Sequence, residues 1–106
     1  MREKLIAIIK NYGAYPQISK AVEELIELAE VLIKDINKSE LNTNELYEEI
    51  ADVEIMLAQL KIIYNINDEI LKNYKMRKVE RTMDRMKRTY FNEDDKPVYQ
   101  PDCAWE

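Results

Sequence analysis

Histidine is absent from this 106-residue chain, and its absence excludes several kinds of chemistry. A Ser-His-Asp triad cannot form without an imidazole, and zinc sites with histidine ligands are excluded as well. Di-iron carboxylate bundles use Glu-x-x-His pairs, so the sequence excludes that class too. A metal site in this chain would rest on oxygen ligands, which favour hard cations such as Mg²⁺, Mn²⁺ or Ca²⁺.

Glycine and cysteine are each reduced to a single residue. One glycine is too few for a turn-rich β protein, whereas 35% charged and 46% hydrophobic residues suit helices with charged outer faces. A lone Cys103 provides no disulfide framework. We find neither an apolar run of about 18 residues nor a signal-peptide cleavage site. We therefore expect one all-α domain in the cytoplasm, with no membrane partner.

Apolar residues at helical spacing predict four helices, over about residues 2–12, 16–36, 45–64 and 67–90. We expect Thr43 or Asn44 to cap the third helix. From residue 92 onward, two prolines, several charges and no period indicate a tail. The predicted organisation is a helical domain over residues 1–91 followed by a polar C-terminal tail over residues 92–106.

The middle helices carry extensive apolar faces. The predicted face of the second helix consists of Ile18, Ala21, Val22, Leu25, Leu28, Ala29, Leu32 and Ile36. The third helix is apolar on two sides, one with Leu46, Ile50, Val53, Leu57, Leu60 and Tyr64, the other with Ala51, Ile55, Ala58 and Ile62. Such a helix is expected to be covered on most sides. Because a core this small is marginal, a second subunit would help to stabilise it.

Charge is unevenly distributed along the chain. Residues 72–88 carry a net charge of +6, while the whole chain carries −5, so the remainder carries −11. Overall acidity argues against a nucleic-acid polymer as the partner. A basic stripe on the fourth helix consists of Tyr74, Lys78, Arg81, Arg85 and Arg88. The stripe is explained either as a solvated face or as a phosphate-binding surface.

Two pairs of acids, Glu24/Glu27 and Glu49/Asp52, are each spaced three residues apart. On a helix this spacing separates two residues by about 60° and about 4.5 Å along the axis, which suits a shared ion. Glu49 falls inside the apolar arc of the third helix and Asp52 lies beside Met56 and Ile63, so both are expected to be sheltered, whereas Glu24 only borders the arc of the second helix. A solvated face, a salt bridge to the basic helix and a bound cation all remain open. Without compensation, the carboxylates would repel one another and raise each other's pKa values.

The stretches SKAVEELIELAEVLIK and NELYEEIADVEIMLAQL contain Glu-x-x-Glu, a spacer of 21 residues and Glu-x-x-Asp. They resemble the MazG-like all-α nucleoside triphosphate pyrophosphohydrolases, in particular the small single-module kind of phage and Gram-positive bacteria. The resemblance implies a four-helix MazG-like bundle completed by oligomerisation, as a homodimer or homotetramer. Water would attack the α-phosphorus of a ribo- or deoxynucleoside triphosphate, giving the monophosphate and pyrophosphate.

The resemblance also implies roles for particular residues. Mg²⁺, with Mn²⁺ as a substitute, would be held by the residues that also serve catalysis: Glu24, Glu27, Glu49 and Asp52. From charge and helical position alone, we expect the triphosphate to contact Lys75, Lys78 and Arg81. Tyr12, Tyr15 and Gln17 would border a substrate pocket or simply pack a loop. The alternative functions are a non-catalytic helical interaction module and a nucleotide sensor without turnover.

Overall fold

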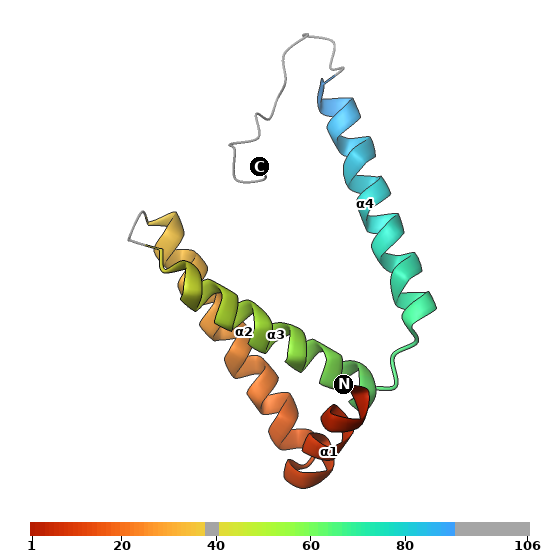
Figure 1. Cartoon of the computed structure of the whole chain (residues 1–106). Helices are drawn as coiled ribbons and strands as arrows, with labels where there is room; N and C mark the ends of the chain where they lie inside the picture. Colours follow the sequence, from red (N-terminus) through yellow and green to blue (C-terminus); the bar gives the residue numbers. More distant parts are fainter. Residues whose placement is uncertain (38–40, 91–106) are drawn as a thin grey trace. The chain divides into compact units, whose positions relative to one another are not determined.

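The computed structural model describes residues 1–37 and 41–90, with side chains to residue 88 (Figure 1). The sequence-based expectation of an all-α protein with four helices is confirmed, and the described residues contain no strand. The helices are α1 (Arg2–Tyr12), α2 (Ala14–Ile36), α3 (Thr43–Ile63) and α4 (Asp68–Tyr90). The predicted tail, residues 92–106, lies outside the described residues. The described chain falls into two compact units, with α1, α2 and α3 in the first and α4 in the second.

Gly13 joins α1 to α2 in a conformation that favours glycine. Its φ of 97° lies in a region that side chains with a Cβ rarely adopt, and its N–H donates to the Ile9 carbonyl at 2.7 Å. Pro16 lies in the first turn of α2, where a missing N–H removes no intrahelical hydrogen bond. The predicted end of the first helix at Gly13 is therefore confirmed.

The ends of α3 are fixed by two asparagines. The Asn42 side chain accepts a hydrogen bond from the Glu45 N–H at 3.2 Å, so the predicted caps, Thr43 and Asn44, are wrong. At the other end Asn65 has a φ of 51°, and its N–H donates to the Ile62 carbonyl. The next N–H, of Ile66, donates to the Lys61 carbonyl, which completes a Schellman motif.

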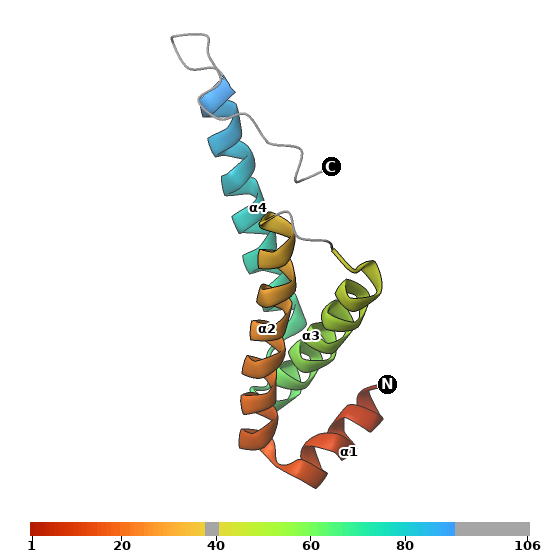
Figure 2. The ribbon, with the colours of Figure 1, turned by 90° about the vertical axis from the view of Figure 1, so that its left-hand side faces the viewer.

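The first unit is built on a pair of helices, α2 and α3, which pack against each other and run in opposite directions (Figures 1 and 2). The α1 helix contacts both. The buried hydrophobic residues of the described chain are Leu5, Ala21, Val31, Val53 and Met56. This short list shows that the unit has a small core of its own.

The face of α2 that packs within the chain differs from the one that apolar patterning predicts. Its buried residues are Gln17, Ala21, Glu24 and Val31, at helical spacings of four, three and seven. Of the predicted face, Val22, Leu25, Leu32 and Ile36 are exposed, at 52%, 45%, 45% and 74%. Most of the predicted apolar face is thus exposed within the described residues. The reason is that α2 contacts α3 through a more polar stripe and leaves its more apolar stripe uncovered within the described chain.

The α3 helix is likewise covered on one side only. Its buried residues are Val53, Met56 and Gln59, whereas Ile50 and Leu57 are exposed at 41% and 46%. The described residues alone therefore do not cover most of this helix, and its coverage by a second subunit stays a prediction. The second apolar side lacks a partner among the described residues.

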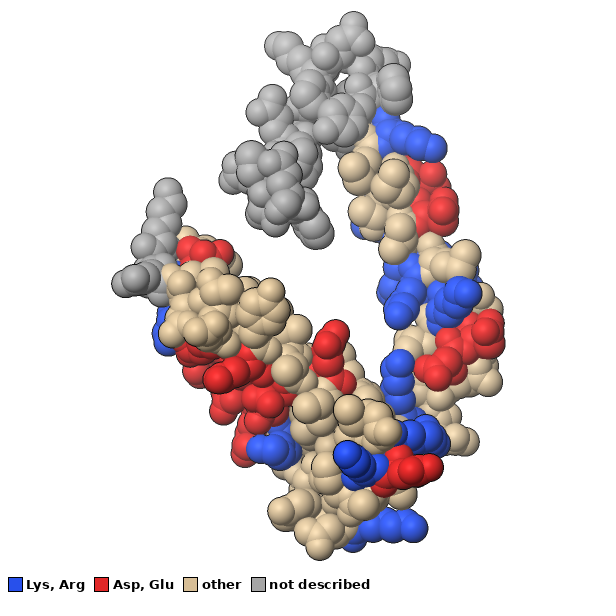
Figure 3. All heavy atoms as spheres, in the orientation of Figure 1, with Lys and Arg blue, Asp and Glu red and all other residues tan. Residues whose placement is uncertain are grey.

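The second unit shows α4 as an exposed helix with charged and apolar stripes. Basic side chains recur along it in Figure 3. The Arg77 guanidinium lies 4.7 Å from the centre of the Tyr74 ring, a cation–π contact. The apolar residues at spacings of three and four are also exposed: Met76, Val79, Met83 and Met86. No helix in the described ranges combines the length and hydropathy needed to cross a bilayer.

Candidate metal centre

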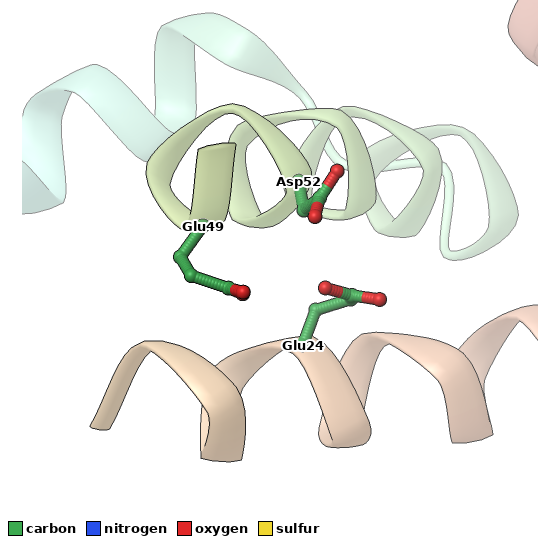
Figure 4. Close-up of side chains that lie close together, drawn as sticks. All are labelled: Glu24, Glu49 and Asp52. Atoms are coloured by element: carbon green, nitrogen blue, oxygen red, sulfur yellow. The ribbon is translucent and has the colours of Figure 1, made fainter. Parts of the chain in front are cut away.

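Three carboxylates converge between α2 and α3 (Figure 4). Glu24 comes from α2, and Glu49 and Asp52 come from α3. Each offers one oxygen atom, and these three oxygens all lie within 4.8 Å of one another. Glu24 thus joins two acids that lie 25 and 28 positions later in the sequence, and we call the three residues the carboxylate cluster.

The packing faces of the two helices explain the convergence. Glu24 lies three residues after Ala21 on the buried stripe of α2, and Glu49 lies four residues before Val53 on that of α3. When the two stripes pack, the two acids face each other. Asp52 follows Glu49 by one helical turn and approaches from the rim.

The degree of burial differs from the sequence-based expectation. Glu24 is buried, at 7% exposure, Glu49 is half-buried and Asp52 is exposed. The expectation had placed Glu49 and Asp52 in the sheltered position and Glu24 at its border. It failed for Glu24 because the contact with α3 selects a different stripe of α2, and for Asp52 because this residue lies at the rim of the helix pair rather than on the packed stripe of α3.

Only part of the negative charge is compensated. The Lys20 ammonium donates to Glu24 Oε1 at 3.3 Å, one turn earlier on α2. Two other oxygens, Glu24 Oε2 and Glu49 Oε2, are buried and have no hydrogen-bond partner among the described residues. A buried polar atom without a partner is costly, and more so when it is charged. The cluster thus has the donor chemistry that a hard cation would satisfy.

The electrostatics of the cluster show the same imbalance. Burial raises the pKa of Glu49 above its ordinary value, and the nearby charges of Glu24 and Asp52 raise it further. A hydrogen bond with Glu27 opposes this rise in pKa. The hydrogen bond to Glu24 and the charge of Glu24 raise the pKa of Lys20. The protein therefore holds more negative charge here than its own cations neutralise.

The remaining predicted site residues are placed differently. Glu27 is exposed on α2 and is not one of the three converging carboxylates. It interacts with the carboxylate cluster through Glu49. Lys75, Lys78 and Arg81 are exposed on α4, in the second unit. Their assignment to triphosphate binding stays a prediction.

A cavity of about 410 Å³ lies beside the carboxylate cluster, within the first unit. Glu24 and Asp52 form part of its wall, as do the predicted pocket residues Tyr12 and Gln17. Gln59, at 2% exposure, also lines it. Sequence reasoning missed Gln59, although a lone amide between Met56 and Ile63 on an apolar helical stripe was a usable signal.

When the chain is compared with known proteins, no family model, curated protein or solved structure matches it.

Proposed function

We propose that the chain is a Mg²⁺-dependent nucleoside triphosphate pyrophosphohydrolase that works as a homo-oligomer. The observation that supports this proposal is the carboxylate cluster, in which two buried oxygens lack a partner. The reaction class is proposed from the Glu-x-x-Glu and Glu-x-x-Asp spacings, which resemble those of the MazG-like enzymes. Mn²⁺ would substitute for Mg²⁺, since both prefer oxygen ligands.

The residues of the cluster suit this metal. Glu24, Glu49 and Asp52 would hold it, and Glu27 would support Glu49 from α2. Mg²⁺ typically takes few protein carboxylates and completes its coordination with phosphate oxygens and water. When bound, it would stabilise charge on the triphosphate and lower the pKa of a coordinated water. Asp52, the exposed ligand, lies where substrate and water can reach it.

The proposed chemistry is hydrolysis of the bond between the α- and β-phosphates. Water attacks the α-phosphorus and pyrophosphate leaves, so that the other product is the nucleoside monophosphate. The half-buried position of Glu49 and the buried position of Glu24 limit bulk water on the helix side of the site. The exposed basic residues of α4, Lys75, Lys78 and Arg81, are proposed to contact phosphate oxygens, for which Lys and Arg are suited.

Assembly is supported by the uncovered stripe of α2. Its members alternate at spacings of four and three, as in a coiled-coil seam: Ile18, Val22, Leu25, Ala29, Leu32 and Ile36. We call this set the α2 seam. A second copy of the chain would bury it, which compensates for the small core of one chain. A homodimer is the simplest such assembly, and a homotetramer would bury α3 as well.

A non-catalytic interaction module is the second candidate, because the α2 seam would serve any helical partner. That reading accounts for the exposed apolar residues. It leaves the buried unpaired oxygens of Glu24 and Glu49 unexplained. A nucleotide sensor would use the same cluster without turnover.

The test is a panel of ribo- and deoxynucleoside triphosphates with Mg²⁺, scored for pyrophosphate against single-phosphate release. We expect pyrophosphate, loss of turnover in Asp52→Asn, and full turnover in the control Glu48→Gln, which changes an exposed acid of the same helix. Mg²⁺ binding without turnover would indicate the sensor. If neither Mg²⁺ binding nor turnover is found, the interaction module is the better account.

A further inference from the structure

Gln59 carries a third buried polar atom without a partner among the described residues, separate from the two carboxylate oxygens. The side chain is 2% exposed, and its Oε1 has no hydrogen-bond partner among the described residues. A buried amide oxygen without a donor is destabilising. Native chains rarely keep such a group without a ligand, a water or a functional reason.

The surroundings of Gln59 show what could pair with it. Gln59 lines the cavity of about 410 Å³, and so does a second buried amide, Gln17, at 5% exposure. Apolar walls come from Ile8, Ile55 and Met56. The volume lies within the range of about 300–1,000 Å³ that is usual for small-molecule pockets.

The same cavity is bordered by two members of the carboxylate cluster, Glu24 and Asp52. It therefore combines apolar walls, two amides and the candidate metal ligands in one space. A nucleotide has the matching parts. Its base is flat, with apolar faces and N–H donors at the edge, and its phosphates would accompany a cation.

We propose that this cavity binds the nucleobase of a nucleotide and that Gln59 is a specificity-determining residue, whose Oε1 accepts a hydrogen bond from a base N–H. The placement of the phosphates rests on the proposed function, whereas the base-binding role of Gln59 stands on the cavity. Oε1 is enclosed in this structure, and we expect the carboxamide to present it to the base by turning about its last side-chain bond, a soft torsion. A base whose edge supplies a donor there is favoured over one that offers only an acceptor.

The first experiment titrates the ¹⁵N-labelled protein, in EDTA, with dAMP, dCMP, dGMP and dUMP. The side-chain amide signals of Gln59 and Gln17 are followed by NMR. We expect at least one nucleotide to shift the Gln59 signals, and to bind more tightly than the others. 2-Deoxyribose 5-phosphate, which has the sugar and phosphate without the base, is the matched probe and should leave these signals in place.

The second experiment replaces the amide with an apolar side chain of similar length, Gln59→Met. We expect about tenfold weaker binding of the preferred nucleotide and a smaller difference among the four bases. The melting temperature should stay level or rise, because the substitution removes an unpaired buried oxygen. The Mg²⁺ response should persist, since Gln59 is not part of the carboxylate cluster.

These outcomes separate the two proposals. Glu49→Gln, at a member of the carboxylate cluster that does not line the cavity, should lose the Mg²⁺ response yet keep the base-dependent shift of Gln59. Failure of Mg²⁺ to bind the wild type would contradict the metal centre alone. Equal shifts with 2-deoxyribose 5-phosphate, or unchanged base preference in Gln59→Met, would overturn the role of Gln59 and leave it a purely structural amide.

Discussion

At the scale of single residues, the excess negative charge of the carboxylate cluster affects the pKa of Glu49. Its pKa is raised, so the folded chain binds the Glu49 proton more tightly than the unfolded chain does. Stability therefore falls as pH rises from the ordinary value of 4.5 through the raised one. Once the pH has passed through this range, the ionised Glu49 lowers the stability of the metal-free protein.

We predict that Glu49→Gln raises the melting temperature of the metal-free protein at pH 7.5. This gain should shrink as the pH falls through and below about 4.5, where Glu49 becomes protonated even in the unfolded chain. Melting curves of the two proteins across this pH range, in EDTA, measure it. Glu48→Gln removes one charge from the exposed side of the same helix and gives the general charge effect to subtract. A gain that does not change with pH would show that Glu49 is not the titrating group.

Individual residues also show what the sequence could and could not predict. The spacing of Glu49 and Asp52 and the position of Glu49 on an apolar arc were sufficient to place it between helices. The burial of Glu24 could not be predicted, because α2 has two candidate inner faces and only the contact with α3 selects one. Gln59 was missed since apolar patterning treats an amide in a stripe as an interruption.

At the scale of helices, the start of α3 shows how closely a helix boundary can be predicted from the sequence. The segment Asn42-Thr43-Asn44 offers three residues that all favour the N-cap position. Sequence preference therefore predicted a helix start here but not its residue. The extended backbone of Asn42, with φ −89° and ψ 108°, makes it the cap.

We predict that Asn42→Ala destabilises the protein by about 1 kcal/mol, because the Glu45 N–H loses its acceptor. Urea unfolding at fixed protein concentration, with the slope shared between variants, gives this difference. Asn44→Ala is the matched control and should change the free energy of unfolding by less than about 0.5 kcal/mol. If Asn44→Ala lowers the free energy of unfolding by as much as Asn42→Ala does, Asn42 is not the specific cap of this helix.

At the scale of the whole molecule, the exposed α2 seam is the feature that sequence patterning left undecided. Patterning identified the seam correctly as apolar, but it did not show whether the seam packs within one chain or against a second one. The seam lies beside the packed stripe, about 100° around the helix, and most of it is exposed in this structure. Sequence patterning alone cannot distinguish an intrachain core from an interface between copies.

We predict that the wild type sediments as a dimer or larger species and that its melting temperature rises with protein concentration. Leu32→Glu, at a seam residue that is 45% exposed in one chain, should shift the population toward monomer and remove this dependence. Glu30→Gln, at a nearby exposed position outside the seam, should sediment like the wild type. A wild type that stays monomeric at all concentrations would contradict the assembly.

The most direct measurement of the central claim is a calorimetric titration of Mg²⁺ into the metal-free protein, repeated with Glu24→Gln. We expect saturable binding of Mg²⁺ by the wild type at constant ionic strength. We expect at least about tenfold weaker binding by the variant, since Glu24 contributes one of the three converging oxygens and a buried, unpaired second one. If the wild type shows no saturable heat, or if the variant binds Mg²⁺ as tightly as the wild type does, these carboxylates do not form a metal centre.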